Sequence, residues 1–228
     1  HTMAFDNAYK KINEITTNIE IIIKDKKEAI QMAVIALLSR GHLLIEDVPG
    51  VGKTVLAHSL AKSLACNFRR IQFTSDLLPS DVLGVNIFNP SSRVFEFVKG
   101  PIFSNVVLAD EINRSTPKTQ SSLLEAMSEG QVTIDNKTYH LEEPFMVIAT
   151  QNPKEHYGTY PLPESQLDRF NLRISLGYPD EDHEKMVITG LRTSEKINSL
   201  LPVITIQEIQ ELQSLVEQVR VEKSVLEY

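Results

Sequence analysis

The chain has 228 residues, of which 42% are hydrophobic, and it carries a formal net charge of −7. This length is sufficient for one substantial hydrophobic core and a small second domain. The negative charge argues against a protein that neutralises the phosphates of a nucleic-acid duplex over a broad surface, so we do not expect nucleic acid as a partner.

No apolar stretch approaches the ~20 residues that a membrane-spanning helix needs, and nothing at the start resembles a signal peptide. Cys66 is the only cysteine, so it cannot form an internal disulfide. It falls in an apparent helix, where we expect a buried packing role in a reducing compartment. These features predict a cytoplasmic protein. Residues 1–3, which place His-Thr before Met3, resemble a tag remnant and are set aside.

The first predicted elements are a helix over 7–20, an amphipathic helix over 26–38 and a short apolar strand over 43–45. Between this strand and a helix over 53–64 lies the run Asp47-Val-Pro-Gly-Val-Gly-Lys-Thr54. A glycine-containing turn between a strand and a helix is the layout of a phosphate-binding loop. An ordinary glycine turn before a helix is the alternative.

The residue types of this run fit the chemistry of phosphate binding. Gly50 and Gly52 let successive backbone N–H groups face an anion at the positive end of the helix. Lys53 supplies a positive charge to the β and γ phosphates, and the Thr54 hydroxyl is placed to bind Mg²⁺. Asp47 departs from the pattern, because the motif ordinarily begins with glycine. The residues predicted to bind nucleotide in this stretch are Pro49, Gly50, Val51, Gly52, Lys53, Thr54 and Val55.

Strands continue to alternate with helical segments further along the chain. The runs 68–73, 106–109, 145–149 and 172–175 are predicted strands. This alternation predicts an α/β protein in which helices cover both faces of a parallel sheet.

Two predicted hairpins interrupt the alternation. One occupies 85–99, with its turn at 89–92, and the other pairs 131–134 with 138–141 across Asp135-Asn136-Lys137. Hairpins inserted into an alternation of strands and helices suggest a function outside the central sheet. The alternative is that they only extend an edge of the sheet.

Three polar residues follow buried strands. Asp110 and Glu111 come directly after the strand 106–109, at the edge where open parallel sheets bind ligands. Asp110 would hold Mg²⁺ through its water shell, while Glu111 would orient and deprotonate the water that attacks the γ phosphate. Asn152 follows the strand 145–149 and would hydrogen-bond the attacking water or the γ phosphate. A surface acid pair and a turn-forming asparagine are the alternatives.

Arg169 is predicted on a short helix just before the strand 172–175. From there it would reach the nucleotide of a neighbouring subunit, where a guanidinium stabilises charge in the transition state. A salt bridge from Arg169 to Asp168 or Glu164 is the alternative. Arg173 is a second candidate for the same role.

Helical patterns replace strands after residue 178, at 181–191 and 207–219. We therefore expect a nucleotide-binding core over 4–178 and a small helical domain over 179–228.

Taken together, these motifs resemble those of the MoxR group of the AAA+ ATPase family. The matching motifs are LIEDVPGVGKT from Leu44, LLPSDVLG from Leu77, GPIFSNVVLADEINRSTPKTQSSLLEAMSEGQVT from Gly100, PFMVIATQNP from Pro144 and GTYPLPESQLDRF from Gly158. The resemblance implies a three-layer αβα P-loop fold with a five-stranded parallel sheet, β-hairpin inserts and a partial C-terminal helical lid. It also implies site roles: Lys53 and Thr54 as Walker A, Asp110 and Glu111 as Walker B, Asn152 as sensor 1 and Arg169 as the arginine finger.

The same resemblance implies ATP and Mg²⁺ as ligands, hydrolysis of ATP to ADP and phosphate, and a homo-oligomer in the form of a hexameric ring. It implies chaperone-like remodelling or maturation of protein complexes, with a client or partner that carries a von Willebrand factor A domain. Adenine would be contacted near Ile22 and Ile23. The lid arginine called sensor 2 is not visible in the sequence, so the lid is expected to be truncated before it.

Three other functions remain open from the sequence. A nucleotide-dependent binding module would use occupancy alone to switch partner affinity, without significant hydrolysis. A metal-chelatase subunit would share the same hairpin inserts. A nucleic-acid motor would belong to a related ring, but the acidic composition disfavours it.

Overall fold

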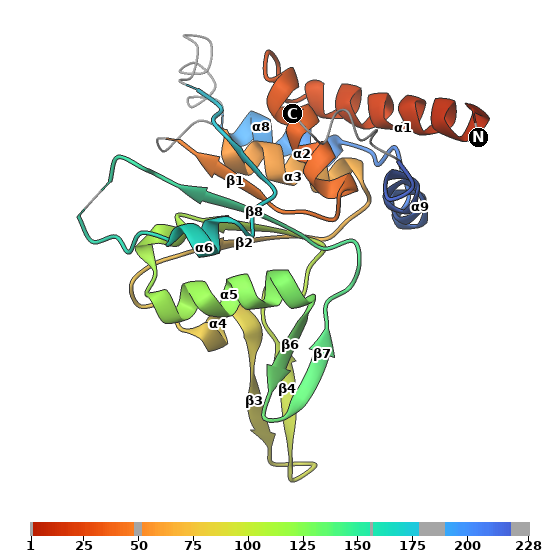
Figure 1. Cartoon of the computed structure of the whole chain (residues 1–228). Helices are drawn as coiled ribbons and strands as arrows, with labels where there is room; N and C mark the ends of the chain where they lie inside the picture. The colour runs from red at the N-terminus through yellow and green to blue at the C-terminus, as the bar shows by residue number, and fades with distance from the viewer. Residues whose placement is uncertain (1, 48–51, 156, 178–189, 220–228) are drawn as a thin grey trace.

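A five-stranded parallel sheet is the central layer of the computed structural model, which describes residues 2–47, 52–155, 157–177 and 190–219 (Figure 1). The strands lie in the order β2-β5-β8-β1-β9, and each neighbouring pair is parallel. Their bounds are Leu43–Glu46 for β1, Phe68–Gln72 for β2, Val106–Asp110 for β5, Met146–Gln151 for β8 and Leu172–Ile174 for β9.

Helices cover both faces of this sheet (Figure 1). One face carries α1 (Thr2–Glu20), α2 (Lys27–Leu38), α3 (Lys53–Ser63), α8 (Gly190–Ser199) and α9 (Ile206–Val216). The other face carries α4 (Pro79–Leu83), α5 (Pro117–Glu129) and α6 (Glu164–Leu167). The expected three-layer αβα fold with a five-stranded parallel sheet is confirmed. None of the helices in the part of the chain that the structure describes is long and apolar enough to cross a membrane.

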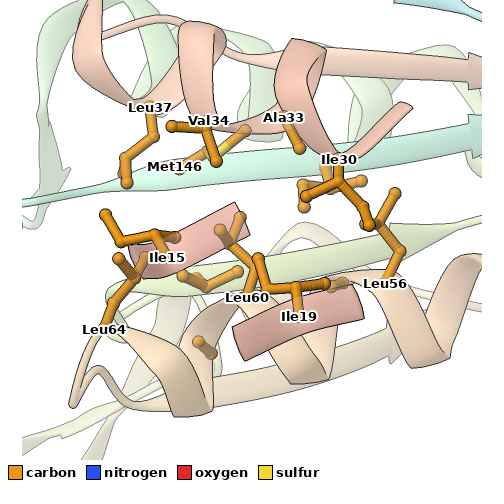
Figure 2. Packing of buried hydrophobic residues seen from close by; sticks show 14 of the residues in the cluster. Ile15, Ile19, Ile30, Ala33, Val34, Leu37, Leu56, Leu60, Leu64 and Met146 are labelled. Carbon is orange, nitrogen blue, oxygen red and sulfur yellow. The ribbon is translucent and has the colours of Figure 1, made fainter. Parts of the chain in front are cut away.

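Successive side chains of each strand point to opposite faces of the sheet, and the interior is therefore divided into two hydrophobic clusters. Leu43 and Ile45 of β1 belong to the cluster under α1, α2 and α3, whereas Leu44 belongs to the cluster under α5. Successive strand side chains point to opposite faces, so a strand covered on both faces must be apolar at every position. Figure 2 shows the first cluster, in which Ile15 and Ile19 of α1 lie among side chains of α2 and α3.

The C-terminal helices pack on the first of these clusters. Ile197 of α8 and Ile209 of α9 are buried in it, and the Gln213 Nε2 donates a hydrogen bond of 2.8 Å to the Leu37 carbonyl at the end of α2. The expected helix over 181–191 lies almost entirely outside the described residues. The described part of 179–228 thus shares a core with α1 to α3, and the division into two domains stays a prediction.

Both expected hairpins are present, and both project from the same end of the molecule (Figure 1). They consist of β3 (Gly84–Asn89) with β4 (Val94–Lys99), and β6 (Gln131–Ile134) with β7 (Lys137–His140). The second turn is shorter than expected, because Lys137 is already paired with Ile134. Asp135 and Asn136 form a two-residue turn with φ values of 47° and 63°, and two positive φ angles are characteristic of the type I′ hairpin turn.

Two local expectations need correction. Helix α5 was not among the predicted elements, although Pro117 at its first turn and Gly130 at its end, with a φ of 63°, are ordinary helix boundary signals. Cys66 does not lie in a helix, since α3 ends at Ser63. Cys66 is only partly buried, but it packs against the first hydrophobic cluster as expected, and burial raises the pKa of its thiol to about 12.

His42 is a buried histidine whose two ring nitrogens both form hydrogen bonds. Its Nδ1 accepts a hydrogen bond of 2.9 Å from the Val147 N–H, and its Nε2 lies 3.2 Å from the Met127 carbonyl oxygen. Because Nδ1 is an acceptor, the proton is on Nε2, which donates to Met127, and the ring is neutral. Burial lowers the pKa of His42 from 6.5 to about 4, against a smaller opposing effect of the Met127 carbonyl.

We expect the free energy of unfolding to decrease as the pH falls from 6.5 to about 4. In this window His42 is protonated in the unfolded chain but not in the folded chain. The contribution of the neutral ring to the free energy of unfolding is therefore fully present above pH 6.5 and fully lost below pH 4. The two pKa values correspond to a loss of about 3 kcal/mol. Urea unfolding across this pH range measures it.

The matched control is His58→Gln, because burial also lowers the pKa of His58, but that side chain is only partly buried. The His42→Gln variant should lose most of the pH dependence, whereas His58→Gln should keep it. An unchanged pH dependence in His42→Gln would show that another group is responsible.

Candidate functional site

The described end of the phosphate loop is the start of helix α3. Gly52 precedes the helix with a φ of 82°, a left-handed conformation that favours glycine. Lys53, Thr54 and Val55 occupy the first turn of α3. Pro49, Gly50 and Val51 lie outside the described residues.

Lys53 has an unusual environment for a lysine. Its side chain is only 8% exposed. Within the described ranges, the structure shows no hydrogen bond or ion pair for its ammonium group. Burying an uncompensated charge is costly, so a buried amine at the N-terminus of a helix is suited to an anionic ligand.

Asp110 is held at the end of β5 by partners on both neighbouring strands. Its Oδ2 accepts hydrogen bonds from the Arg70 guanidinium on β2, with Nη2 at 2.6 Å and Nε at 3.2 Å. Its Oδ1 accepts a hydrogen bond of 2.6 Å from the Thr150 hydroxyl on β8. The carboxylate is thus fixed in one orientation, with one oxygen paired to a cation.

Glu111 directly follows β5 in a left-handed conformation, with a φ of 56°. Such a conformation is uncommon for a residue with a Cβ and is found at functional sites. The backbone N–H donates a hydrogen bond of 2.8 Å to the Thr150 hydroxyl oxygen, which also donates to Asp110. The side-chain Oε2 lies 3.0 Å from the Gln72 Nε2 and 3.2 Å from the Arg114 Nε.

Asn152 lies beside the start of the phosphate loop. It follows β8, whose last residue, Gln151, is paired in register with Glu46 of β1, and the Asp47 N–H donates a 3.1 Å hydrogen bond to the Gln151 carbonyl. Asn152, Asp47 and Ser175 line one cavity of about 240 Å³ at the carboxyl edge of the sheet. The structure thus brings Asn152 together with Asp47 at the start of the loop.

Arg169 lies apart from this edge. It follows α6 instead of lying within it, since that helix ends at Leu167. Its Nη1 donates hydrogen bonds of 3.0 Å to the Leu124 carbonyl and 2.8 Å to the Ser128 hydroxyl, near the C-terminus of α5. A cation is favourable there because the C-terminal end of a helix carries the negative end of the helix dipole.

The salt bridges considered for Arg169 belong to Arg173 instead. The Arg173 Nη2 lies 3.7 Å from Glu164 and 3.8 Å from Asp168. The alternative in which these acids pair with Arg169 therefore does not hold among the described contacts. Glu164 is the first residue of α6 and Asp168 follows its last, and the β9 side chain of Arg173 is the one that reaches them.

Ile22 and Ile23 follow helix α1 and are largely buried, with exposed fractions of 5% and 8%. Both belong to the hydrophobic cluster under α1, α2 and α3. Their contact with an adenine base stays a prediction.

The donors available for a metal are the Thr54 hydroxyl and the Asp110 carboxylate. Both are hard oxygen ligands of the type that Mg²⁺ prefers, and Mg²⁺ ordinarily keeps several waters and takes few protein ligands. No group of three or more His, Cys, Asp or Glu side chains is placed to bind a metal within the described residues. This donor set fits Mg²⁺ bound together with phosphate oxygens, and not a metal enclosed by protein ligands.

Sequence reasoning missed four residues that hold the acid pair. They are Arg70, Gln72, Arg114 and Thr150. Their signal was weak, because it depends on β2 and β8 lying on either side of β5, which the order of elements alone does not determine. Thr150 was visible only as the residue that follows the predicted strand 145–149.

Comparison with known proteins places this site in a family. A family model described as "ATPase family associated with various cellular activities (AAA)" matches residues 42–172. Protein YeaC of Bacillus subtilis is 49% identical over 98% of this chain and 70% of its own length. Chaperone MoxR1 of Mycobacterium tuberculosis is 42% identical over 82% of this chain, and the match spans about half of that protein, 51%.

A solved structure agrees with these relatives. The crystal structure of a candidate ATPase from Cytophaga hutchinsonii superposes with a TM-score of 0.85 at 40% sequence identity, covering 98% of this chain and 69% of that one. A family model over more than half of the length, together with relatives at these identities, establishes that the chain belongs to the MoxR family of AAA+ ATPases.

Proposed function

We propose that this protein binds ATP with Mg²⁺ and hydrolyses it to ADP and phosphate. The observation that carries the proposal is a buried lysine with no partner in the described structure, at the start of α3, on the same sheet edge as Asp110, Glu111 and Asn152. The carboxyl edge of an open parallel sheet is where such folds bind ligands. Membership of an ATPase family supports the same reaction.

Each residue has a role that its chemistry permits. The Lys53 ammonium binds the β and γ phosphates and offsets their charge. Thr54 and Asp110 would hold Mg²⁺, which neutralises charge on the phosphate oxygens when bound. The Asn152 amide donates to or accepts from the attacking water or the γ phosphate without adding charge.

Glu111 acts as the base that orients and deprotonates the attacking water. Its carboxylate is positioned by Gln72 and Arg114, and its backbone is positioned by Thr150. Contacts on both the backbone and the side chain restrict the carboxylate to a narrow range of positions, and such preorganisation favours general base catalysis.

The work done by hydrolysis is chaperone-like remodelling or maturation of a protein complex. The name of the relative MoxR1, a chaperone, supports this role. We further propose that subunits assemble into a hexameric ring in which Arg169 acts on the nucleotide of a neighbour. Its exposed position away from its own phosphate loop supports this arrangement. The proposed client or partner carries a von Willebrand factor A domain.

Glu111→Gln should bind ATP with nearly unchanged affinity and hydrolyse it at least about a hundredfold more slowly, because the amide cannot accept the proton of the attacking water. Binding is measured by calorimetry and turnover by phosphate release. The matched control is Glu125→Gln, which removes an exposed carboxylate on α5 and should leave turnover unchanged. Wild-type turnover in Glu111→Gln would remove Glu111 from the mechanism.

Arg70→Gln should lower the Mg²⁺ concentration needed for half-maximal ATP binding by a factor of about 3, because the Arg70 guanidinium neutralises Asp110 and competes with the metal for it. The measurement is a Mg²⁺ titration of ATP binding followed by calorimetry. The control is the adjacent exposed arginine in Arg69→Gln. An identical Mg²⁺ dependence in wild type and Arg70→Gln would show that the ion pair does not compete with the metal.

Arg169→Ala should reduce turnover by about 10³-fold or more if the guanidinium stabilises the transition state. Mixing the Arg169→Ala variant with the Glu111→Gln variant shows whether Arg169 acts on its own subunit or on a neighbouring one. Sites that combine Glu111 of one subunit with Arg169 of its neighbour should regain activity, so the mixture should exceed the sum of the two variants. No gain on mixing would contradict action between subunits, and the same experiment with Arg173→Ala tests the second candidate.

A further inference from the structure

Asp47 is the residue at which the phosphate loop departs from its usual pattern, and the structure shows a defined environment for it. The side chain is 9% exposed. Its Oδ1 accepts a hydrogen bond of 2.8 Å from the Ser175 hydroxyl, and its Oδ2 accepts one from the Leu176 N–H. Both partners lie directly after β9, which ends at Ile174.

Leu176 is held from a second direction as well. Its carbonyl oxygen accepts a hydrogen bond of 2.7 Å from the Lys26 Nζ, at the start of α2. Its side chain is 7% exposed and packs in the cluster under α1, α2 and α3. One peptide segment is thus fixed through its N–H by Asp47, through its carbonyl by Lys26, and through its side chain by the core.

This arrangement joins two segments that the fold places at the same sheet edge. Asp47 begins the loop that ends at Lys53, and residues 175–177 follow β9, the edge strand next to β1. A buried carboxylate is costly unless it accepts hydrogen bonds, and bonds to an ionised acceptor are stronger than neutral ones. Breaking the link leaves a buried charge unpaired, so the two segments keep one relative position.

The link also faces the site and not the deep core. Asp47, Ser175 and Gly177 line the same cavity of about 240 Å³ as Asn152. Fixing the first residue of a binding loop before the ligand arrives reduces the ordering that binding requires, and affinity rises accordingly.

We propose that Asp47 is a positioning residue for nucleotide binding: through Ser175 and Leu176 it fixes the start of the phosphate loop against the segment after β9. This inference rests on the proposed nucleotide-binding function. A glycine at this position, as in the usual motif, would leave the Ser175 hydroxyl and the Leu176 N–H without these acceptors.

The test is ADP affinity, measured by calorimetry with Mg²⁺ on the full chain, for Asp47→Ala, Ser175→Ala and the double variant. We expect about tenfold weaker binding for Asp47→Ala and about threefold for Ser175→Ala. Because both act through one link, the double variant should bind as weakly as Asp47→Ala alone. Asp47→Asn keeps one carbonyl acceptor and should fall between wild type and Asp47→Ala.

Thermal unfolding, followed by circular dichroism, separates positioning from a purely structural role. If Asp47 only stabilises the fold, its variants will melt at lower temperature but bind ADP with wild-type affinity well below the melting point, and the inference is overturned. Additive effects of Asp47→Ala and Ser175→Ala overturn it too. Should Asp47→Ala fail to fold, Ser175→Ala decides alone, since wild-type ADP affinity in that variant refutes the link.

The failure of the proposed function gives a different result. In that case the wild-type chain itself binds no ADP, and this inference falls with the function. If the wild-type chain binds and the variants bind equally well, only the role of Asp47 is lost. Lys26→Met is a further comparison, because it releases the Leu176 carbonyl while leaving the Asp47 contacts in place, and it should weaken binding less than Asp47→Ala.

Discussion

A parallel sheet that is buried on both faces is open to a ligand only at its ends, and this constraint organises the whole molecule. Apolar side chains occupy nearly every position of β1, β5 and β8, and helices cover them on each side. Polar chemistry is therefore confined to the residues that immediately follow the strands. Because all five strands run in the same direction, those residues collect along one edge, although they are distant in sequence.

The acidic side chains of the site pair with arginines of the same chain. Asp110 is neutralised by Arg70, and Glu111 is held by Arg114, which also pairs with Glu155. The exception among the described residues is Lys53, which is buried without such a partner. The acids are thus stabilised as they stand, whereas the described residues supply no compensating charge for the lysine. This asymmetry agrees with the anionic ligand proposed for the site.

The sequence was sufficient for the layers and the strands, and it indicated the candidate residues Asp110, Glu111 and Asn152 at the ends of those strands. Their signals were local: apolar runs of strand length, a glycine-rich turn before a helix, and acids directly after a buried strand. The turn at Asp135 was also visible, but its length depends on two positive φ angles that a dipeptide alone does not require. The helix ends at Ser63 and Leu167 were misjudged by one or two residues, because helix ends depend on local capping.

The supporting contacts could not be predicted, since they depend on which strands are neighbours. Arg70 reaches Asp110 only because β2 lies next to β5, and Thr150 reaches it only because β8 lies on the other side. In the sequence, Asp47 was visible only as a departure from the phosphate-loop motif, and nothing indicated which groups donate hydrogen bonds to it. Ser175 and Leu176 become its partners when the strands β1 and β9 pair, a contact across more than a hundred residues of sequence.

The two hairpins have a structural consequence that follows from how they are joined. The Phe97 ring stacks on Tyr139 with centroids 4.1 Å apart, and the Asn86 Nδ2 donates a hydrogen bond of 2.6 Å to the Asp135 Oδ2, so the two hairpins contact each other. At the base of the first hairpin, Gly84 and Gly100 are in such close backbone contact that a Cβ on either would clash. The two hairpins thus contact each other, and the first is tightly packed at its base, so their surfaces are presented together at one end of the molecule (Figure 1).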